Sequence, residues 1–347
     1  MSDMIIAEPL YEKLKKKLLE HIETERPRLL PCEKELIRQY KVSRNTVRRA
    51  IQELADEGIV KPAQGLGTIV YPSPEMVENS MILVLCDFNL YPFQQEVFNQ
   101  LMRALDEYRL NAMLTMVDKE KPDVARLEFL VKKADGVIID QLTSFSTKIH
   151  DIIKTYRRKC VCLRWVPANF RENHVAEDVA HGFYKIARHL IELGHREIAY
   201  LGQAQDPLRC PGIDKALAER SLQIPDERKV HFVNGTRYSG FTAADELLRR
   251  NVAFTAVICH NDDAALGVME QFFLAGMKIP QDVSITGFDN VHDSEFYPVP
   301  LTTCGASMAN MVNEAISILI GNGAKEEPCE KSIEPELIIR RSTDVPR

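Results

Sequence analysis

The stretch SRNTVRRAIQELADEG, residues 43–58, decides the fold of the N-terminal part of the chain. Its apolar side chains recur at helical spacing and form one narrow stripe, Val47, Ala50, Ile51 and Leu54. The remaining face carries cationic and amide side chains, namely Arg44, Asn45, Arg48, Arg49 and Gln52. Ser43 can cap the first turn, and Gly58 can end the helix in a left-handed conformation. The pattern predicts a short helix with a buried back and a polar front.

The polar front of this helix suits DNA. Arginine binds guanine through two parallel hydrogen bonds and also binds phosphate, and asparagine pairs in the same way with adenine. Charge alone leaves a solvated surface helix as the competing interpretation. The neighbouring segments favour DNA.

Two helices precede this stretch and a hairpin follows it. Residues 9–23 predict a helix with Leu10, Leu14, Leu18 and Ile22 on one side, and residues 31–40 predict a second, shorter helix. A tight turn at residues 41–42 joins the second helix to the third. Residues 59–71 contain two short apolar runs around the loop PAQGLG, a hairpin pattern. Together these segments predict a helix-turn-helix followed by a wing.

At this point a family resemblance becomes specific. Residues 29–70, LLPCEKELIRQYKVSRNTVRRAIQELADEGIVKPAQGLGTIV, resemble the winged helix-turn-helix of the GntR family of bacterial transcription regulators. The resemblance implies that DNA is contacted by Lys34, Ser43, Arg44, Asn45, Thr46 and Arg48, with Gln64 and Gly65 of the wing tip approaching the minor groove. Cys32 stands where the family usually has a capping serine, a weaker cap. Lys34 replaces the usual arginine, which makes a contact there less directional.

Length and charge are compatible with a DNA-binding head on a larger body. A chain of 347 residues with 45% apolar residues predicts two or more globular domains. Residues 1–72 hold 13 Lys and Arg against 11 Asp and Glu, a net charge of +2, which leaves −8 of the total −6 for the remainder. This asymmetry is too small to indicate DNA binding by itself. We expect a head over residues 1–72, a linker over 73–80 and an effector domain over 81–347.

From residue 81 onward, strand-like and helix-like runs alternate. Strands are predicted at MILVLC (81), AMLTMV (112), GVIID (136), CVCLRW (160), EIAYLG (197), TAVICH (255) and VSITGF (283). Helical patterns lie between them, including residues 93–108, 182–193 and 264–275. Such alternation predicts parallel sheets covered on both faces. Since about 267 residues exceed one comfortable open sheet, we expect an α/β fold of two doubly wound subdomains.

Polar residues follow several of these strands at their carboxyl ends, where open α/β sheets bind ligands. The candidates are Asp87, Asp140, Trp165, Arg209, Asn261 and Asp289. Carboxylates, an amide, an arginine and one large aromatic ring suit a polyhydroxylated ligand such as a sugar. Plainer roles compete: Asp178 is expected to cap a helix, and Asp262 and Asp263 are alternative caps for the helix after Asn261.

A second resemblance covers residues 81–347. The stretches RHLIELGHREIAYLG, TAVICHNDDAALGVMEQFFLAGMKIPQDVSITGFDN, PLTT and PELIIRRST resemble the effector domain of LacI-type repressors, which has the periplasmic-binding-protein fold. By motif it implies that Arg209, Asn261 and Asp289 contact the effector, while Trp165 and the segment ending at Phe93 match in position only. A GntR-type head on a LacI-type body is similar to the arabinose-responsive repressors of Gram-positive bacteria. The ligand does not follow, since cleft residues vary with it.

Other functional classes find little support. No run reaches the roughly 18 apolar residues of a membrane span, and MSDMIIAEPLYEK lacks the pattern of a secretion signal. The eight cysteines are scattered without CxxC spacing, which disfavours disulfides and zinc. No glycine-rich phosphate loop follows the first strand, and no catalytic or PLP-binding pattern stands out. We therefore expect a cytoplasmic non-enzyme without cofactor or metal.

These observations predict a homodimeric repressor that binds double-stranded operator DNA and is released by a sugar or sugar derivative. A regulator that needs its effector as corepressor is equally compatible with the sequence. A sugar-binding protein without a direct DNA role is the other alternative, and the winged-helix head argues against it.

Overall fold

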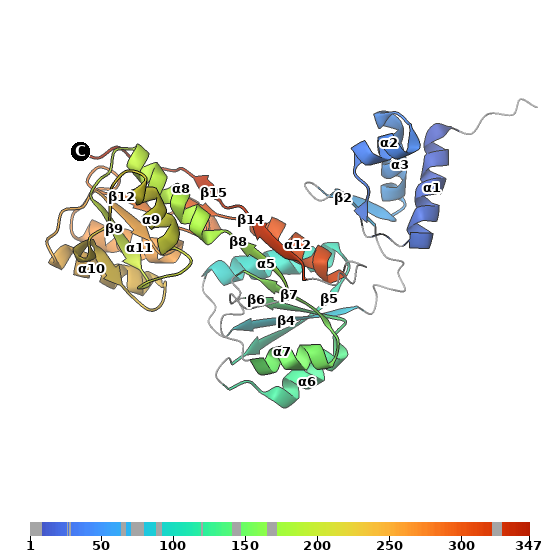
Figure 1. Cartoon of the computed structure of the whole chain (residues 1–347), viewed down its shortest axis with the longest axis horizontal. Coiled ribbons are helices and arrows are strands. Elements are labelled where there is room, and N and C mark those ends of the chain that lie inside the picture. The colour runs from blue at the N-terminus through green and yellow to red at the C-terminus, as the bar shows by residue number, and fades with distance from the viewer. Residues whose placement is uncertain are drawn as a thin grey trace, which may run out of the picture.

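The computed structural model describes residues 9–25, 27, 29–63, 67–70, 80–87, 92–118, 121–140, 147–164, 172–320 and 328–347. Three bodies follow one another along the long axis of the molecule (Figure 1). The N-terminal head lies at one end, a first α/β subdomain lies in the middle, and a second α/β subdomain lies at the other end. The predicted fold class, a winged helix-turn-helix joined to two doubly wound α/β subdomains, is confirmed.

The head consists of three helices and a small antiparallel sheet of order β1-β3-β2. Its elements are α1 (Leu10–Glu25), β1 (Leu29–Leu30), α2 (Glu33–Tyr40), α3 (Arg44–Asp56), β2 (Val60–Ala63) and β3 (Gly67–Val70). The predicted apolar stripe of α3 is completely buried, because it packs against Leu14, Leu18 and Leu36 of the other two helices. Ser43 caps α3 as expected, its hydroxyl accepting a hydrogen bond from the Thr46 amide at 3.2 Å.

The middle subdomain is built on a six-stranded parallel sheet of order β14-β8-β7-β6-β4-β5. Its strands are β4 (Met81–Asp87), β5 (Asn111–Val117), β6 (Gly136–Asp140), β7 (Lys159–Leu163), β8 (Asn173–Glu177) and β14 (Glu330–Ile333). Its helices are α5 (Pro92–Glu107), α6 (Val124–Lys133), α7 (Thr147–Thr155) and α12 (Met308–Ile320). Helices α5 and α12 cover one face of the sheet, and α6 and α7 cover the other (Figure 1).

The distal subdomain has a four-stranded parallel sheet of order β10-β9-β11-β12. Its elements are α8 (Val179–Glu192), β9 (Ile198–Gly202), α9 (Cys210–Ala218), η2 (Asp226–Arg228), β10 (Lys229–His231), α10 (Arg237–Arg249), β11 (Ala256–Cys259), α11 (Asp262–Leu274), β12 (Ser284–Thr286) and η3 (His292–Glu295). A two-stranded antiparallel ribbon of β13 (Thr303–Gly305) and β15 (Glu336–Ile338) completes it. Helices α8 and α9 pack on one face, and α10 and α11 on the other.

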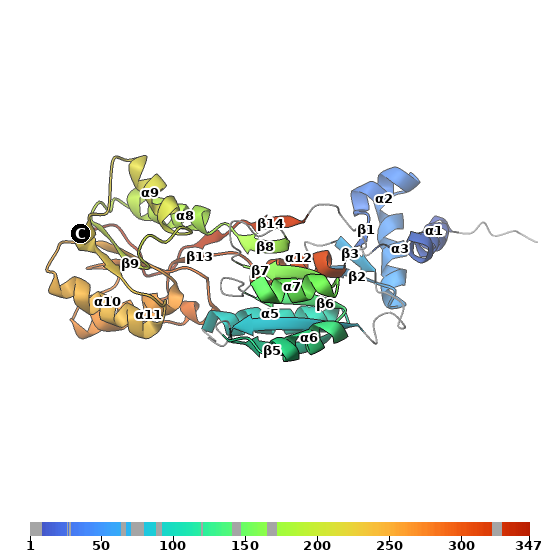
Figure 2. The same cartoon turned by 60° about the horizontal axis from the view of Figure 1, so that its bottom comes forward.

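Three chain segments cross between the subdomains: β8 to α8, β13 to α12, and β14 to β15 (Figure 2). Hydrogen bonds join these segments to one another. The Glu177 carboxylate accepts from the Ala306 amide at 3.1 Å, which links the first crossing to the second. The Asp178 amide donates to the Ile333 carbonyl at 3.2 Å, which links the first crossing to the third. A relative rotation of the subdomains must therefore act on all three segments together.

All seven strands predicted after residue 80 are present, within one or two residues of the predicted bounds. The sequence reading missed β1, β8, β10, β13, β14 and β15, which are two to five residues long and too short for a clear alternating pattern. The predicted linker and the wing tip fall at residues 71–79 and 64–66, outside the described residues. Among the residues that are described, no helix is long and apolar enough to cross a membrane.

Candidate functional site

The exposed face of α3 carries the two arginines expected to contact DNA. Arg44 and Arg48 expose 65% and 57% of their side chains, so neither contributes to the core of the head. Both donate through Nε to one carboxylate, that of Glu33 at the start of α2, at 2.9 and 3.0 Å. These two hydrogen bonds lower the pKa of Glu33. Because only the Nε atoms are used, the terminal nitrogens of both guanidinium groups remain on the outer side of the helix pair.

Arg49 on the same helix has a different environment. Its guanidinium lies 3.8 Å from the centre of the Tyr11 ring of α1, and its Nε lies 3.8 Å from the Glu53 carboxylate. Lys15 of α1 also forms an ion pair with Glu53. Arg49 therefore belongs to the contact between α1 and α3, whereas Arg44 and Arg48 face α2 and the surface.

The remaining predicted DNA contacts lie around the start of α3. Lys34, Ser43 and Asn45 are exposed, and Thr46 is half-buried with its hydroxyl 2.8 Å from that of Ser43. At the Cys32 position, the Glu35 carboxylate accepts a hydrogen bond from the Cys32 amide at 2.9 Å and so stabilises the start of α2. Gln64 and Gly65 lie outside the described residues.

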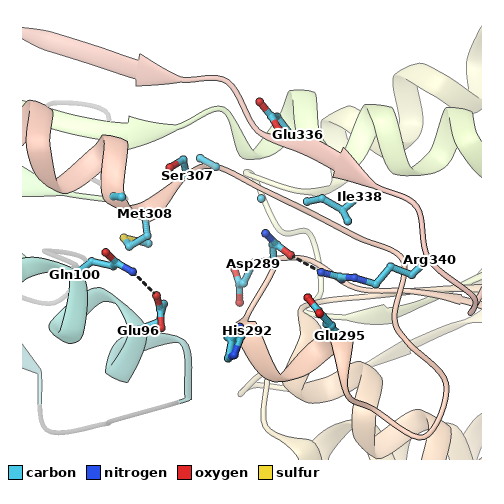
Figure 3. A pocket seen from close by; sticks show the side chains of 14 residues that line it. Glu96, Gln100, Asp289, His292, Glu295, Ser307, Met308, Glu336, Ile338 and Arg340 are labelled. Atoms are coloured by element: carbon cyan, nitrogen blue, oxygen red, sulfur yellow. Dashed lines mark hydrogen bonds between the residues drawn. The ribbon is translucent and has the colours of Figure 1, made fainter. Parts of the chain in front are cut away.

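A cavity of about 380 Å³ lies between the two subdomains (Figure 3). Glu96 and Gln100 of α5 form one side, and His292, Glu295 and Arg340 lie on the opposite side, with Asp289 between them. The wall is completed by Asn290, residues 305–309, Glu336 and Ile338. Since α5 belongs to the middle subdomain and η3 to the distal one, a ligand here would contact both.

The backbone places Asp289 firmly in this wall. Asp289 follows β12 and has φ of +102°, a conformation that L residues rarely adopt. Gly305 of β13 packs against it, and a Cβ at Gly305 would lie 2.8 Å from the Asp289 backbone. Burial, reinforced by the negative charges of Glu177 and Asp262, raises the pKa of Asp289 well above its ordinary value. The next residue, Asn290, accepts a hydrogen bond from Arg340 at 3.1 Å.

Arg209 is held rigidly at the start of α9. Its Nη1 donates to the Asp206 carboxylate at 3.0 Å and its Nε donates to the His260 carbonyl at 3.1 Å. The guanidinium also lies 5.5 Å from the centre of the Phe183 ring. Asp206 and His260 are buried, and burial together with the Arg209 charge lowers the pKa of His260 well below its ordinary value. His260 is therefore neutral near pH 7.

The helix cap expected from Asp262 or Asp263 is supplied by Asn261 instead, which corrects that alternative. The Asn261 side-chain oxygen accepts from the Ala264 amide at 2.9 Å, so only its amide nitrogen is available for other contacts. Asp262 points into the protein, where it accepts from the Thr303 hydroxyl at 2.6 Å and the Val291 amide at 2.9 Å. Burial raises the pKa of Asp262 to about 7. The expected cap by Asp178 is confirmed.

Asp140 lies at the end of β6 and is buried with Arg164. Both carboxylate oxygens of Asp140 accept from Arg164, at 2.8 and 2.9 Å. The charge of Arg164 also acts on Asp289 and on Glu177, so the end of β6, the end of β8 and the distal subdomain meet here. Burial raises the pKa of Glu177, which the sequence reading overlooked. Its position at the end of β8 was not recognisable, because that strand itself was missed.

Three other predicted effector contacts cannot be placed by their side chains. Asp87 ends β4, where it pairs with Val117, and Phe93 lies in the first turn of α5, but neither side chain is described. Trp165 lies outside the described residues. Sequence reading also missed Arg164, Asp206, His260, Glu96, Gln100, His292, Glu295 and Arg340. Most of these follow no strand in an obvious way, so only the distance from Arg209, Asp289 or α5 reveals them.

Known proteins resemble the chain in both parts. Residues 6–70 match the model for bacterial regulatory proteins of the gntR family, and residues 187–343 match that for the periplasmic binding protein-like domain. The HTH-type transcriptional repressor PurR of Mannheimia succiniciproducens is 30% identical over 71% of this chain and 77% of its own length. PurR of Glaesserella parasuis is 31% identical with the same coverage.

Solved structures resemble the fold. A LacI family transcriptional regulator from Enterococcus faecium with bound ribose has a TM-score of 0.67 at 24% identity, covering 77% of this chain and 100% of that one. The transcriptional regulator CelR in complex with cellobiose has a TM-score of 0.66 at 24% identity, covering 87% and 91%. At these identities the likeness shows the fold alone.

Proposed function

Because the chain belongs to the family of HTH-type transcriptional repressors that includes PurR, we propose that it is a repressor controlled by a sugar-type effector bound between its two subdomains. DNA binding and repression follow from the family. The effector class, its direction of action and the dimeric state are the proposed parts. Such a repressor acts in the cytoplasm, where its operator is.

The cavity between the subdomains carries this proposal. Its wall offers carboxylates, amides and a hydroxyl, which are the groups that pair with the hydroxyls of a sugar. It also takes residues from both subdomains, so a ligand that fits one relative orientation better than another shifts the population of orientations. The shift in DNA affinity equals the difference between the ligand's affinities for the two states. Resemblance to arabinose-responsive repressors supports a sugar, although arabinose itself is only one candidate.

We propose release from the operator as the direction of control. The same linkage permits corepression, in which the effector favours the orientation that binds DNA. Operator titrations with and without effector distinguish the two, since release lowers the operator affinity and corepression raises it.

We also propose that the repressor acts as a homodimer whose two heads contact the two half-sites of a pseudo-palindromic operator. Large apolar side chains lie exposed on both subdomains, and a second copy would cover them. Met102 and Leu114 are 42% and 44% exposed on the middle subdomain, and Tyr238 and Phe296 are 75% and 69% exposed on the distal one. Sedimentation equilibrium of the full chain tests this, and a monomer at micromolar concentration contradicts it.

The test of the effector is a thermal-shift screen against neutral sugars, followed by operator titration. A compound that binds the folded state raises the melting temperature by mass action. The proposal expects a sugar to raise the melting temperature and to change operator affinity in the same concentration range. A sugar that stabilises the protein without changing operator affinity would support a sugar-binding protein without a regulatory role.

A further inference from the structure

The two arginines near the inter-subdomain site are already paired with carboxylates of their own. Arg209 and Asp206 lie 3.0 Å apart with 15% and 2% of their side chains exposed. Arg164 and Asp140 lie 2.8 Å apart with 10% and 3% exposed. Each pair is neutral as a whole and poorly screened by solvent, so neither arginine offers an uncompensated positive charge to a ligand.

The carboxylates facing this region are not compensated in the same way. In the described part of the chain, no donor lies within hydrogen-bond distance of the Asp289 carboxylate, and Glu177 receives one hydrogen bond, from the Ala306 amide. The charges of Glu177 and Asp262 act on Asp289 in the same unfavourable direction as its burial. Neutral His260 adds no positive charge on the side of Arg209.

The rest of the cavity wall has the same imbalance. Glu96, Glu295 and Glu336 line it together with Asp289. Its one arginine, Arg340, donates to the Ser294 hydroxyl, the Leu301 carbonyl and Asn290 at 3.2, 2.7 and 3.1 Å, so its nitrogens are committed to the distal subdomain. Within the described residues, acceptors for hydrogen bonds therefore greatly exceed free donors at this site.

We propose that the site selects its effector by charge, accepting a neutral or amino sugar whose donors reach Asp289 and Glu177, and rejecting phosphorylated or carboxylated sugars. This rests on the proposed function, because it assumes that the effector occupies the cavity. Ligand hydroxyl or ammonium groups supply the donors that a poorly solvated carboxylate lacks. A phosphate would instead meet like charges, with both nearby arginines already paired.

Matched ligands provide the direct test on the full-length repressor. Calorimetric and thermal-shift titrations compare glucose, glucosamine, glucose 6-phosphate and glucuronate, and likewise ribose and ribose 5-phosphate, with orthophosphate as the simplest anion. We expect binding only from neutral or amino members, with each anionic counterpart weaker by about tenfold or more. Saturable binding of orthophosphate or a sugar phosphate that is lost in Arg209→Ala overturns the proposal.

A second measurement needs no ligand and so separates this proposal from the proposed sugar effector. Asp289→Asn keeps the shape and removes one unpaired charge, so it should raise the melting temperature near pH 8 more than near pH 5. Asp140→Asn is the matched control, because it leaves the Arg164 charge unpaired and should lower the melting temperature. If Asp289→Asn lowers the melting temperature as Asp140→Asn does, a cation compensates Asp289 and the charge argument fails, whether or not a sugar binds.

Discussion

Replacing Arg44 by alanine tests the DNA-binding face of α3 most directly. A side chain that pairs with a base in the major groove contributes about 1–3 kcal/mol. Arg44 must first leave its exposed ion pair with Glu33, and such pairs contribute roughly 0.2–1 kcal/mol. The net loss in Arg44→Ala is therefore about 1–2 kcal/mol for each head, or about 5- to 30-fold in operator affinity. Two heads on one operator would roughly double the free-energy loss.

Folding should be almost unaffected by this change. Arg44 exposes 65% of its side chain, and surface substitutions of this kind usually alter the free energy of unfolding by less than about 0.5 kcal/mol. The melting temperature of the variant should therefore match that of the parent, and operator binding is measured by fluorescence anisotropy at one fixed salt concentration. Fixed salt is needed because phosphate contacts make affinity strongly salt-dependent.

Arg49→Ala is the matched control, since it removes the same charge from the same helix at a similar exposure of 63%. Arg49 contacts Tyr11 and Glu53, so its loss should weaken operator binding by no more than about threefold, through the general charge alone. The reasoning is refuted if Arg44→Ala binds the operator like the parent, or if both variants lose affinity equally.

Three further predictions concern the effector domain. Arg209→Ala removes a guanidinium fixed by Asp206 and His260, so operator binding should stay near the parental level while the response to effector disappears; a parental response in the operator titration would exclude Arg209 as a contact. Asp262 has a pKa of about 7 in the folded protein against 3.8 ordinarily, so its contribution to stability is full below about pH 4 and is lost as the pH rises through 7, by roughly 1.4 kcal/mol per unit of difference at most. Asp262→Asn keeps both acceptor contacts and should therefore flatten the fall in melting temperature between about pH 5 and 8, whereas an unchanged slope assigns that fall to other groups. Trp165 is the one tryptophan of the chain and is expected near the cleft and hinge, so effector binding should shift or quench the intrinsic emission with a saturable curve that Trp165→Phe abolishes, and a bound effector that leaves the spectrum unchanged contradicts that placement.

The sequence by itself determined the elements with strong periodicity and the order in which they occur. The stripe of α3 and the seven long apolar strands were readable, because burial on one face or on both leaves a repeat of 3.6 or 2 residues or a continuous apolar run. Arg209, Asn261 and Asp289 were also readable as candidates, because each lies just after a strand or at a family motif. Whether each of them contacts an effector is decided by the experiments above.

Only the tertiary structure decided which charges are free and which are already paired. Glu33 lies 11 residues from Arg44 and Asp140 lies 24 residues from Arg164, and no local pattern announces either pair. The role of Asn261 as the cap, with Asp262 turned inward to Thr303, likewise depends on β13, which lies about 40 residues later in the chain. Glu177 was missed because a five-residue strand carries too little periodicity, although its carboxylate joins two of the three crossings. Hydrogen bonds and ion pairs act over a few ångströms in space, and the chain brings such partners together only once its sheets have formed.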